Sequence, residues 1–188
     1  MLRIIAGKYR HLIIEAPSTN TTRPTTDKVR EAVMSSLGTS LIDATILDLF
    51  AGSGALGLEA LSRGAKTAIF CDNNYLAIKT IKDNISKLKI SEEVEIYKCS
   101  YKETLNQLKE KNEIIDILFL DPPYIKENVY QEVCDFLFDN NLLSNNAIII
   151  KEWNKQIPID NLFNHHKSYS YGTINIIIEI NDLFNEGI

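Results

Sequence analysis

Short apolar runs alternate with amphipathic segments through most of this chain, and this alternation limits the possible fold more than any other feature. Several runs are apolar at nearly every position, which is typical of strands buried on both faces of a parallel sheet. The runs lie at 45–50, 67–71, 94–99, 115–120 and 147–151. Apolar residues recur at helical spacing between them, within 54–63, 75–88, 101–109 and 127–138. The pattern predicts an α/β fold with a doubly wound sheet and right-handed crossovers.

The segment before this alternation has a different character. Residues 3–15 contain two short strand-like runs around Gly7 and Lys8, which predict a small β-hairpin. A polar loop and then a helix are expected to follow. Thr26 is the expected N-cap of this helix and Gly38 its expected stop.

The chain of 188 residues is long enough for one domain with a substantial core. Two strand-like runs within 167–180 are separated by Gly172 and Thr173, which predicts an antiparallel hairpin that closes the sheet. We therefore expect a core domain over residues 39–188, preceded by an N-terminal extension over residues 1–38.

Charge is distributed unevenly along the chain. The net charge is −5, but residues 1–30 carry six basic and two acidic residues, so this arm is +4 and the remainder is −9. A basic arm on an acidic body fits local contact with the phosphates of a nucleic acid, although chance clustering on a solvated surface would look the same. The candidate phosphate contacts are Arg3, Lys8, Arg10, Arg23, Lys28 and Arg30.

Other features exclude whole classes of protein. No apolar run approaches the ~20 residues of a membrane-spanning helix, and the first ten residues do not resemble a secretory signal. Cys71, Cys99 and Cys134 are widely spaced within apolar stretches, which indicates buried free thiols in a reducing compartment such as the cytoplasm. The sequence has no Cys/His cluster, so no metal site is expected.

A glycine-rich loop follows the first core strand. Gly52, Gly54 and Gly57 match G-x-G-x-x-G, and Asp72 lies 20 residues past Gly52 at the end of the next strand. This spacing alone is a fingerprint of dinucleotide binding, in which the acidic residue binds the ribose hydroxyls. NAD is therefore one candidate cofactor.

Asp48, at the end of the first core strand, favours a different cofactor. The pyrophosphate of NAD would approach this position, and a carboxylate would repel it. S-adenosylmethionine (SAM) instead brings an ammonium and a sulfonium group, which Asp48 attracts, while backbone N–H groups at the helix start can bind its carboxylate. We therefore predict SAM. A tight turn without any ligand is the remaining alternative, and the three glycines with two strand-end acids argue against it.

The tetrapeptide Asp121-Pro122-Pro123-Tyr124 follows the apolar strand that ends at Leu120. Two prolines fix a rigid bend and remove two backbone donors, so the Asp121 carboxylate and the Pro122 carbonyl remain as acceptors. Two acceptors that hold the N–H bonds of an exocyclic amino group would free its lone pair for methyl transfer, while Tyr124 stacks on the base. The turn predicts a SAM-dependent methyltransferase acting on a base. A proline-rich strand exit with a packing tyrosine is the structural alternative.

Three longer stretches carry a resemblance to a known family: RPTTDKVREAV at 23–33, DLFAGSGALGLEALSRGA at 48–65, and DPPY at 121–124. They resemble the RsmD family of 16S rRNA guanine-N2 methyltransferases, and the similarity extends from residue 3 to residue 178. The glycine motif and DPPY are shared with wider methyltransferase groups, whereas RPTTDKVRE and SRGA are more specific. The resemblance implies a Rossmann-like SAM-dependent methyltransferase fold with a seven-stranded, mostly parallel sheet and a small N-terminal extension.

The resemblance also implies roles for individual residues. The candidate cofactor-binding residues are Asp48, Phe50, Ala51, Gly52, Ser53, Gly54, Asp72, Asn73, Ser100, Arg23 and Thr25, and the candidate catalytic residues are Asp121, Pro122, Pro123 and Tyr124. Ser100 is a departure from the family, which commonly has an Asp there to meet the adenine amino group. A neutral hydroxyl should accept that hydrogen bond more weakly.

Members of this family act on a guanine of small-subunit rRNA, and they prefer assembling subunits to naked RNA. We therefore expect 16S rRNA in an assembling small subunit as the partner, a monomeric enzyme, and a target base that is unpaired or flipped. Three alternatives stay open: an adenine-N6 or protein-glutamine amino methyltransferase, a silent SAM- or RNA-binding module, and an NAD dehydrogenase. Asp rather than Asn at position 121 favours guanine over the first alternative.

Overall fold

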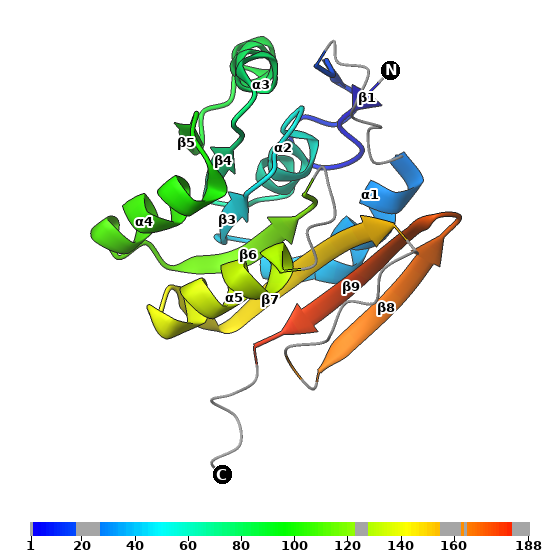
Figure 1. The fold of residues 1–188 in the computed structure, drawn as a ribbon. Helices are drawn as coiled ribbons and strands as arrows, with labels where there is room; N and C mark the ends of the chain where they lie inside the picture. The colour runs from blue at the N-terminus through cyan, green and yellow to red at the C-terminus, as the bar shows by residue number, and fades with distance from the viewer. Residues whose placement is uncertain (1, 18–26, 123–127, 155–162, 164, 182–188) are drawn as a thin grey trace.

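The computed structural model describes residues 2–17, 27–122, 128–154, 163 and 165–181 (Figure 1). Its strands are β1 (Leu2–Arg3), β2 (Ile13–Ile14), β3 (Thr45–Asp48), β4 (Thr67–Cys71), β5 (Glu93–Tyr97), β6 (Ile115–Leu120), β7 (Leu143–Asn154), β8 (His166–Tyr171) and β9 (Ile174–Ile180). Its helices are α1 (Asp27–Leu37), a 3-10 turn η1 (Gly38–Leu41), α2 (Ala55–Ser62), α3 (Tyr75–Leu88), α4 (Tyr101–Lys111) and α5 (Val129–Asp139).

The centre of the molecule is a seven-stranded sheet with the order β5-β4-β3-β6-β7-β9-β8. The first five strands in this order run parallel, and β9 is antiparallel to both of its neighbours. This arrangement confirms the predicted Rossmann-like methyltransferase fold, including the C-terminal hairpin around Gly172 and Thr173. The order reverses at β3, where chain connections leave in opposite directions, and ligands bind at such points in α/β sheets.

Helices cover both faces of the sheet, and the alternation of side chains along each strand explains why. Ile46 of β3 packs into a core with α1, α2 and α3, whereas the adjacent Leu47 packs into a second core with α4 and α5. Residues Ile117 and Leu118 of β6 divide in the same way. Because both faces are buried, every position of β3, β4 and β6 favours an apolar residue, which is the pattern that reveals these strands in the sequence.

The described part of the basic arm that precedes α1, residues 2–17, packs onto the same core as α1–α3. Leu2, Ile4, Tyr9 and Ile14 are buried there. The predicted hairpin is present, but its strands are only two residues long, and they pair Leu2 with Ile14 and Arg3 with Ile13. The segment between them turns onto α2 instead of extending the ladder, because its backbone groups bond to α2 side chains.

Element boundaries differ from the predicted ones mainly near the ends. β3 stops at Asp48, so Phe50 belongs to the loop, and β7 is longer than predicted because it pairs with β9 along most of its length. Gly38 follows α1 as expected, whereas the expected N-cap Thr26 lies outside the described residues. Within the described part of the chain, no helix is long and apolar enough to span a membrane.

Candidate cofactor and catalytic site

The strand order brings four predicted site residues into one row at the carboxyl edge of the sheet. Ser100, Asp72, Asp48 and Asp121 follow or end β5, β4, β3 and β6, which are consecutive neighbours in the sheet. These residues lie far apart in sequence, and only the parallel pairing places them side by side. A separate cavity of about 830 Å³, lined by residues such as Asp43, Asp116 and Asn145, contains none of the predicted site residues.

Asp48 is the most buried acid of this row, with 3% of its surface exposed. The Gly57 N–H donates to Asp48 Oδ2 at 3.2 Å. Burial nevertheless raises the pKa of Asp48 to about 7, and the carboxylates of Asp121 and Asp72 add to this effect. A buried carboxyl with two acidic neighbours favours a cationic ligand, because a positive charge would stabilise its ionised form.

Asp72 shapes the glycine loop through its carboxylate. Gly52 N–H donates to Asp72 Oδ2 at 2.9 Å, and Asn74 N–H donates to Oδ1 at 2.8 Å. Each carboxylate oxygen has a second lone pair, so Asp72 can still accept from the two hydroxyls of a ribose. Asn73 is exposed beside it.

The glycine loop leads directly into α2, with Gly54 at its N-cap. Gly57 is required for close packing, since a Cβ added there would lie 2.4 Å from Phe70 Cε1. The absence of a side chain lets α2 approach β4, and the Gly57 N–H in the first turn of α2 donates to Asp48. The other N–H groups at the start of a helix suit the carboxylate of an amino-acid ligand. Ala51 is buried, and Ser53 is partly exposed in the loop.

Asp121 follows β6 directly, partly buried, and Pro122 after it is buried. Desolvation raises the pKa of Asp121 to about 6. The nearby Tyr130 of α5 donates its hydroxyl to the Glu152 carbonyl at 2.7 Å, which joins α5 to the end of β7. Burial raises the pKa of Tyr130, and Asp121 contributes to that shift. The predicted residues Pro123, Tyr124, Arg23 and Thr25 lie outside the described residues.

Aromatic rings flank the glycine loop on the side of α4. Phe50 and Tyr101 have ring centroids 5.6 Å apart, and Tyr101 donates its hydroxyl to Glu132 of α5 at 2.8 Å. Ser100 is the N-cap of α4, in a capping box with Glu103. Its hydroxyl donates to Glu103 Oε2 at 2.7 Å, so this carboxylate lies beside the position where the family commonly has an Asp.

The predicted RNA-contact residues of the arm differ in exposure. Arg3, Lys8, Arg10 and Lys28 are exposed. Lys8 Nζ, however, forms an ion pair with Glu92 at 2.8 Å, so part of its charge is neutralised. Arg23 lies outside the described residues.

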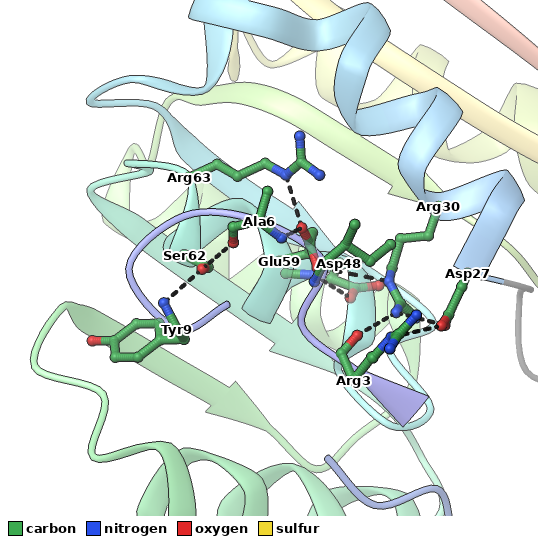
Figure 2. A network of polar contacts seen from close by, with 11 residues as sticks. Arg3, Ala6, Tyr9, Asp27, Arg30, Asp48, Glu59, Ser62 and Arg63 are labelled. Carbon is green, nitrogen blue, oxygen red and sulfur yellow. Dashed lines mark hydrogen bonds and ion pairs between the residues drawn. The ribbon is translucent and has the colours of Figure 1, made fainter. Parts of the chain in front are cut away.

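Arg30 corrects one prediction. Its side chain has no exposed surface, donates to the Arg3 carbonyl, and pairs with Asp27 at 3.0 Å (Figure 2). The prediction that Arg30 contacts RNA is wrong, because no phosphate can reach it in this structure. Arg30, on α1, also pairs with Glu59 of the neighbouring helix α2, with Arg30 Nε 3.8 Å from Glu59 Oε2. Arg30 therefore has a structural role, since its contacts join α1 to the arm and to α2.

Sequence reasoning missed Glu59 and Asn84, both buried polar residues on helices. Figure 2 shows Glu59 at the centre of a network in which it accepts from the backbone N–H of Ala6 and from Arg63 Nε. The available signal was a polar residue on the buried face of each helix. The described residues contain no group of three or more side chains that could hold a metal ion.

Comparisons with known proteins agree with this geometry. Residues 2–179 match the family model described as conserved hypothetical protein 95. The chain is 36% identical to ribosomal RNA small subunit methyltransferase D of Haemophilus influenzae, over 84% of this chain and 81% of that protein. The solved structure of the yhhF protein from Escherichia coli superposes with a TM-score of 0.81 at 30% identity, covering 95% of this chain and 97% of that one.

A more distant structure shares the fold alone. It is the 16S rRNA N2 G1207 methyltransferase RsmC of Thermus thermophilus, in complex with AdoMet and guanosine. Its TM-score is 0.67 at 14% identity, over 88% of this chain and 45% of that one. The match along almost the whole chain and the identity to methyltransferase D together show that this chain belongs to the conserved hypothetical protein 95 family, the RsmD family.

Proposed function

We propose that this protein transfers the methyl group of SAM to the N2 amino group of a guanine in 16S rRNA. The observation that carries the proposal is the row of Asp72, Asp48 and Asp121 on three adjacent strands. Asp72 would bind the ribose hydroxyls of SAM, Asp48 its ammonium group, and Asp121 the amino group that is to be methylated. The names of the relatives, which specify small-subunit rRNA, support the choice of substrate.

The residues present fit SAM. The Asp48 carboxyl is buried, and burial together with the carboxylates of Asp121 and Asp72 raises its pKa, so an ammonium group would suit it. Asp72 would hold the ribose and the start of α2 would hold the ligand carboxylate. SAM, when bound, supplies an electrophilic methyl group. A dinucleotide fits less well, because the same carboxyl would face its phosphates.

Asp121 and the Pro122 carbonyl would position the target amine. An exocyclic amino group donates its lone pair into the base, so two acceptors on its N–H bonds are needed to direct that lone pair outward. The amine loses a proton once it is methylated. Asp121 is suited to accept that proton, because its pKa is raised to about 6 and its proton can then pass to water.

We also propose the assembling small subunit as the substrate, a monomer as the active form, and the cytoplasm as the location. The three free thiols fit a reducing compartment. Comparing naked 16S rRNA with immature subunits as acceptors tests the first point, and sedimentation at working concentration tests the second.

Labelled SAM and small subunits that lack base methylation provide the main test. We expect label in N2-methylguanosine, and a loss of about 100-fold or more in rate for Asp121→Ala. Asp139→Ala, at an exposed position on α5, is the matched control and should behave like the wild type. Label in N6-methyladenosine would support the adenine alternative. SAM binding with no transfer to any subunit would support a silent module.

A further inference from the structure

Asn84 is a buried amide on an otherwise apolar helix face. It lies on α3 with Ala77, Ile78, Ile81 and Leu88, all buried, and only 1% of its surface is exposed. Burying an amide is unfavourable unless its hydrogen bonds are made. A residue of this kind at the centre of a helix face is therefore held there by specific partners.

These partners join two separate parts of the molecule. Glu15 N–H donates to Asn84 Oδ1 at 2.8 Å, while Asn84 Nδ2 donates to the Glu15 carbonyl at 3.0 Å and to the Ser53 carbonyl at 3.1 Å. Both N–H bonds of the amide are used, and the reverse orientation would lose all three hydrogen bonds. Glu15 directly follows β2 in the arm, and Ser53 lies in the glycine loop.

The bond to Ser53 fixes one peptide plane of the loop. The Ser53 carbonyl and the Gly54 N–H belong to the same planar peptide group. The carbonyl is held by Asn84, and the N–H donates to the Ala51 carbonyl at 2.7 Å. Removing Asn84 would release one end of this plane, at the residue that opens α2.

The arm is attached to the same region at a second place. Ile5 N–H donates to Glu59 at 2.7 Å, and Tyr9 N–H donates to Ser62 Oγ at 2.9 Å. Both acceptors lie on α2, the helix that begins at the glycine loop. These contacts fix the arm on the helix body, whereas the Asn84 contact, among those of the described residues, reaches the loop itself.

We propose that Asn84 is a positioning residue that couples the basic arm to the cofactor loop. SAM binding at the loop would then stabilise the arm and tighten RNA binding to it, and bound RNA would tighten SAM binding by the same factor. This inference rests on the proposed function, in which the loop binds SAM and the arm contacts RNA. Asn84 itself contacts neither.

Hydrogen exchange with SAM as the only added ligand tests the coupling. In the wild type, saturating SAM should slow exchange of the amides at 51–54 and also, at least threefold, at Glu15 and its neighbours in the arm. In Asn84→Ala the loop should still be protected by SAM, with an affinity about tenfold weaker, while the SAM-dependent slowing in the arm disappears. Asn106→Ala removes an exposed amide that bonds within α4 and should match the wild type.

Each other outcome is decisive. Protection of the loop without the arm in the wild type overturns the coupling and leaves the proposed function intact. Equal arm protection in wild type and Asn84→Ala assigns Asn84 a purely structural role. Absence of any protection and of any binding heat with SAM would refute the proposed function together with the coupling. Should Asn84→Ala fail to fold, the wild-type measurement alone can still overturn the inference, because it needs no variant.

Discussion

Arg30 and Glu59 form an ion pair in which neither side chain has any exposed surface. Glu59 also accepts from the Ile5 and Ala6 backbones, so one carboxylate holds α1, α2 and the arm together. Such a pair is weak evidence for net stabilisation, but loss of Glu59 leaves the buried Arg30 paired only with Asp27, whose side chain is 40% exposed. The pair thereby fixes how the arm is seated on α2.

Replacing Glu59 by Ala should therefore be severely destabilising. We expect a loss of about 3–5 kcal/mol in the free energy of unfolding, because Arg30 stays buried and two backbone N–H groups lose their acceptor. Urea unfolding followed by circular dichroism measures it. Glu110→Ala, on the exposed side of α4, is the matched control and should change stability by less than about 0.5 kcal/mol. Equal effects of the two substitutions would contradict the assigned role of Glu59.

Gly7→Ala tests the contact between the arm and α2. Gly7 has φ +82°, and a Cβ there would lie 1.7 Å from the Ser62 carbonyl oxygen, so the arm must move. Gly172 has φ +63° with nothing within 4 Å of its added Cβ, which isolates the backbone strain. We expect about 1–2 kcal/mol of destabilisation for Gly172→Ala, and about 1–3 kcal/mol more for Gly7→Ala. Thermal unfolding that ranks the two equally would show that the arm is loosely attached.

SAM affinity should depend on pH through Asp48. Burial raises the pKa of this carboxyl to about 7 in the free protein, and a cationic ligand requires its ionised form. Below pH 7 the ligand must therefore displace a proton, and the affinity should fall by up to about tenfold per pH unit. The dependence due to Asp48 should flatten as the pH rises above 7. Calorimetry from pH 6 to pH 8.5 measures this, and Asp48→Asn should bind weakly with a flat profile. Asp83→Asn, exposed on α3, should retain the wild-type dependence.

The hydrogen bonds at the N-cap of α4 predict how substitutions at Ser100 affect SAM binding. Ser100→Asp alone would place a second carboxylate next to Glu103, because the present hydroxyl donates to Glu103 Oε2. The combination Ser100→Asp with Glu103→Gln removes this repulsion and keeps a capping box. We expect the double variant to bind SAM about tenfold more tightly than the Ser100→Asp single variant. Isothermal titration measures both, and a single variant as tight as the double one would rule out the repulsion.

Arg10 and Lys8 should differ in their contribution to RNA binding. Lys8 is already paired with Glu92, whereas Arg10 is exposed. Arg10→Ala should therefore lower the salt dependence of subunit binding by about one phosphate contact, and Lys8→Ala by less. Binding measured from 50 to 300 mM salt compares the slopes, with SAM affinity as the control. If the salt dependence of binding had the same slope in the wild type and in both variants, Arg10 and Lys8 would not contact RNA.

Much of the fold is predictable from the sequence because its central strands are buried on both faces. An apolar residue is then favoured at every position, and the runs around Ile46, Ile69 and Leu118 are visible without further information. The positions of the acids Asp48, Asp72 and Asp121 were equally predictable from the sequence, since each directly ends or follows such a strand. Family resemblance added the sheet size and the residue roles.

Arg30 and Asn84 show where that reasoning ends. The sequence records the charge of Arg30 but not its burial, which depends on Glu59 from a different helix. Asn84 lies on the same helix face as Ala77, Ile81 and Leu88, and its partners are backbone groups, which have no sequence signature. Polar residues of this kind are placed by tertiary contacts, and periodicity alone cannot distinguish them from solvated ones.

The two neighbours of β3 in the sheet are made at different times during synthesis, β4 before β5 and β6 after it. A chain that has emerged only as far as β5 already contains the arm, Asp48 and Asp72, together with α2 and α3, which share a core with the arm in the complete fold. Asp121 follows much later, and β6 must still pair along the open side of β3. The residues proposed to bind the cofactor are thus synthesised before Asp121, the residue proposed to hold the amine.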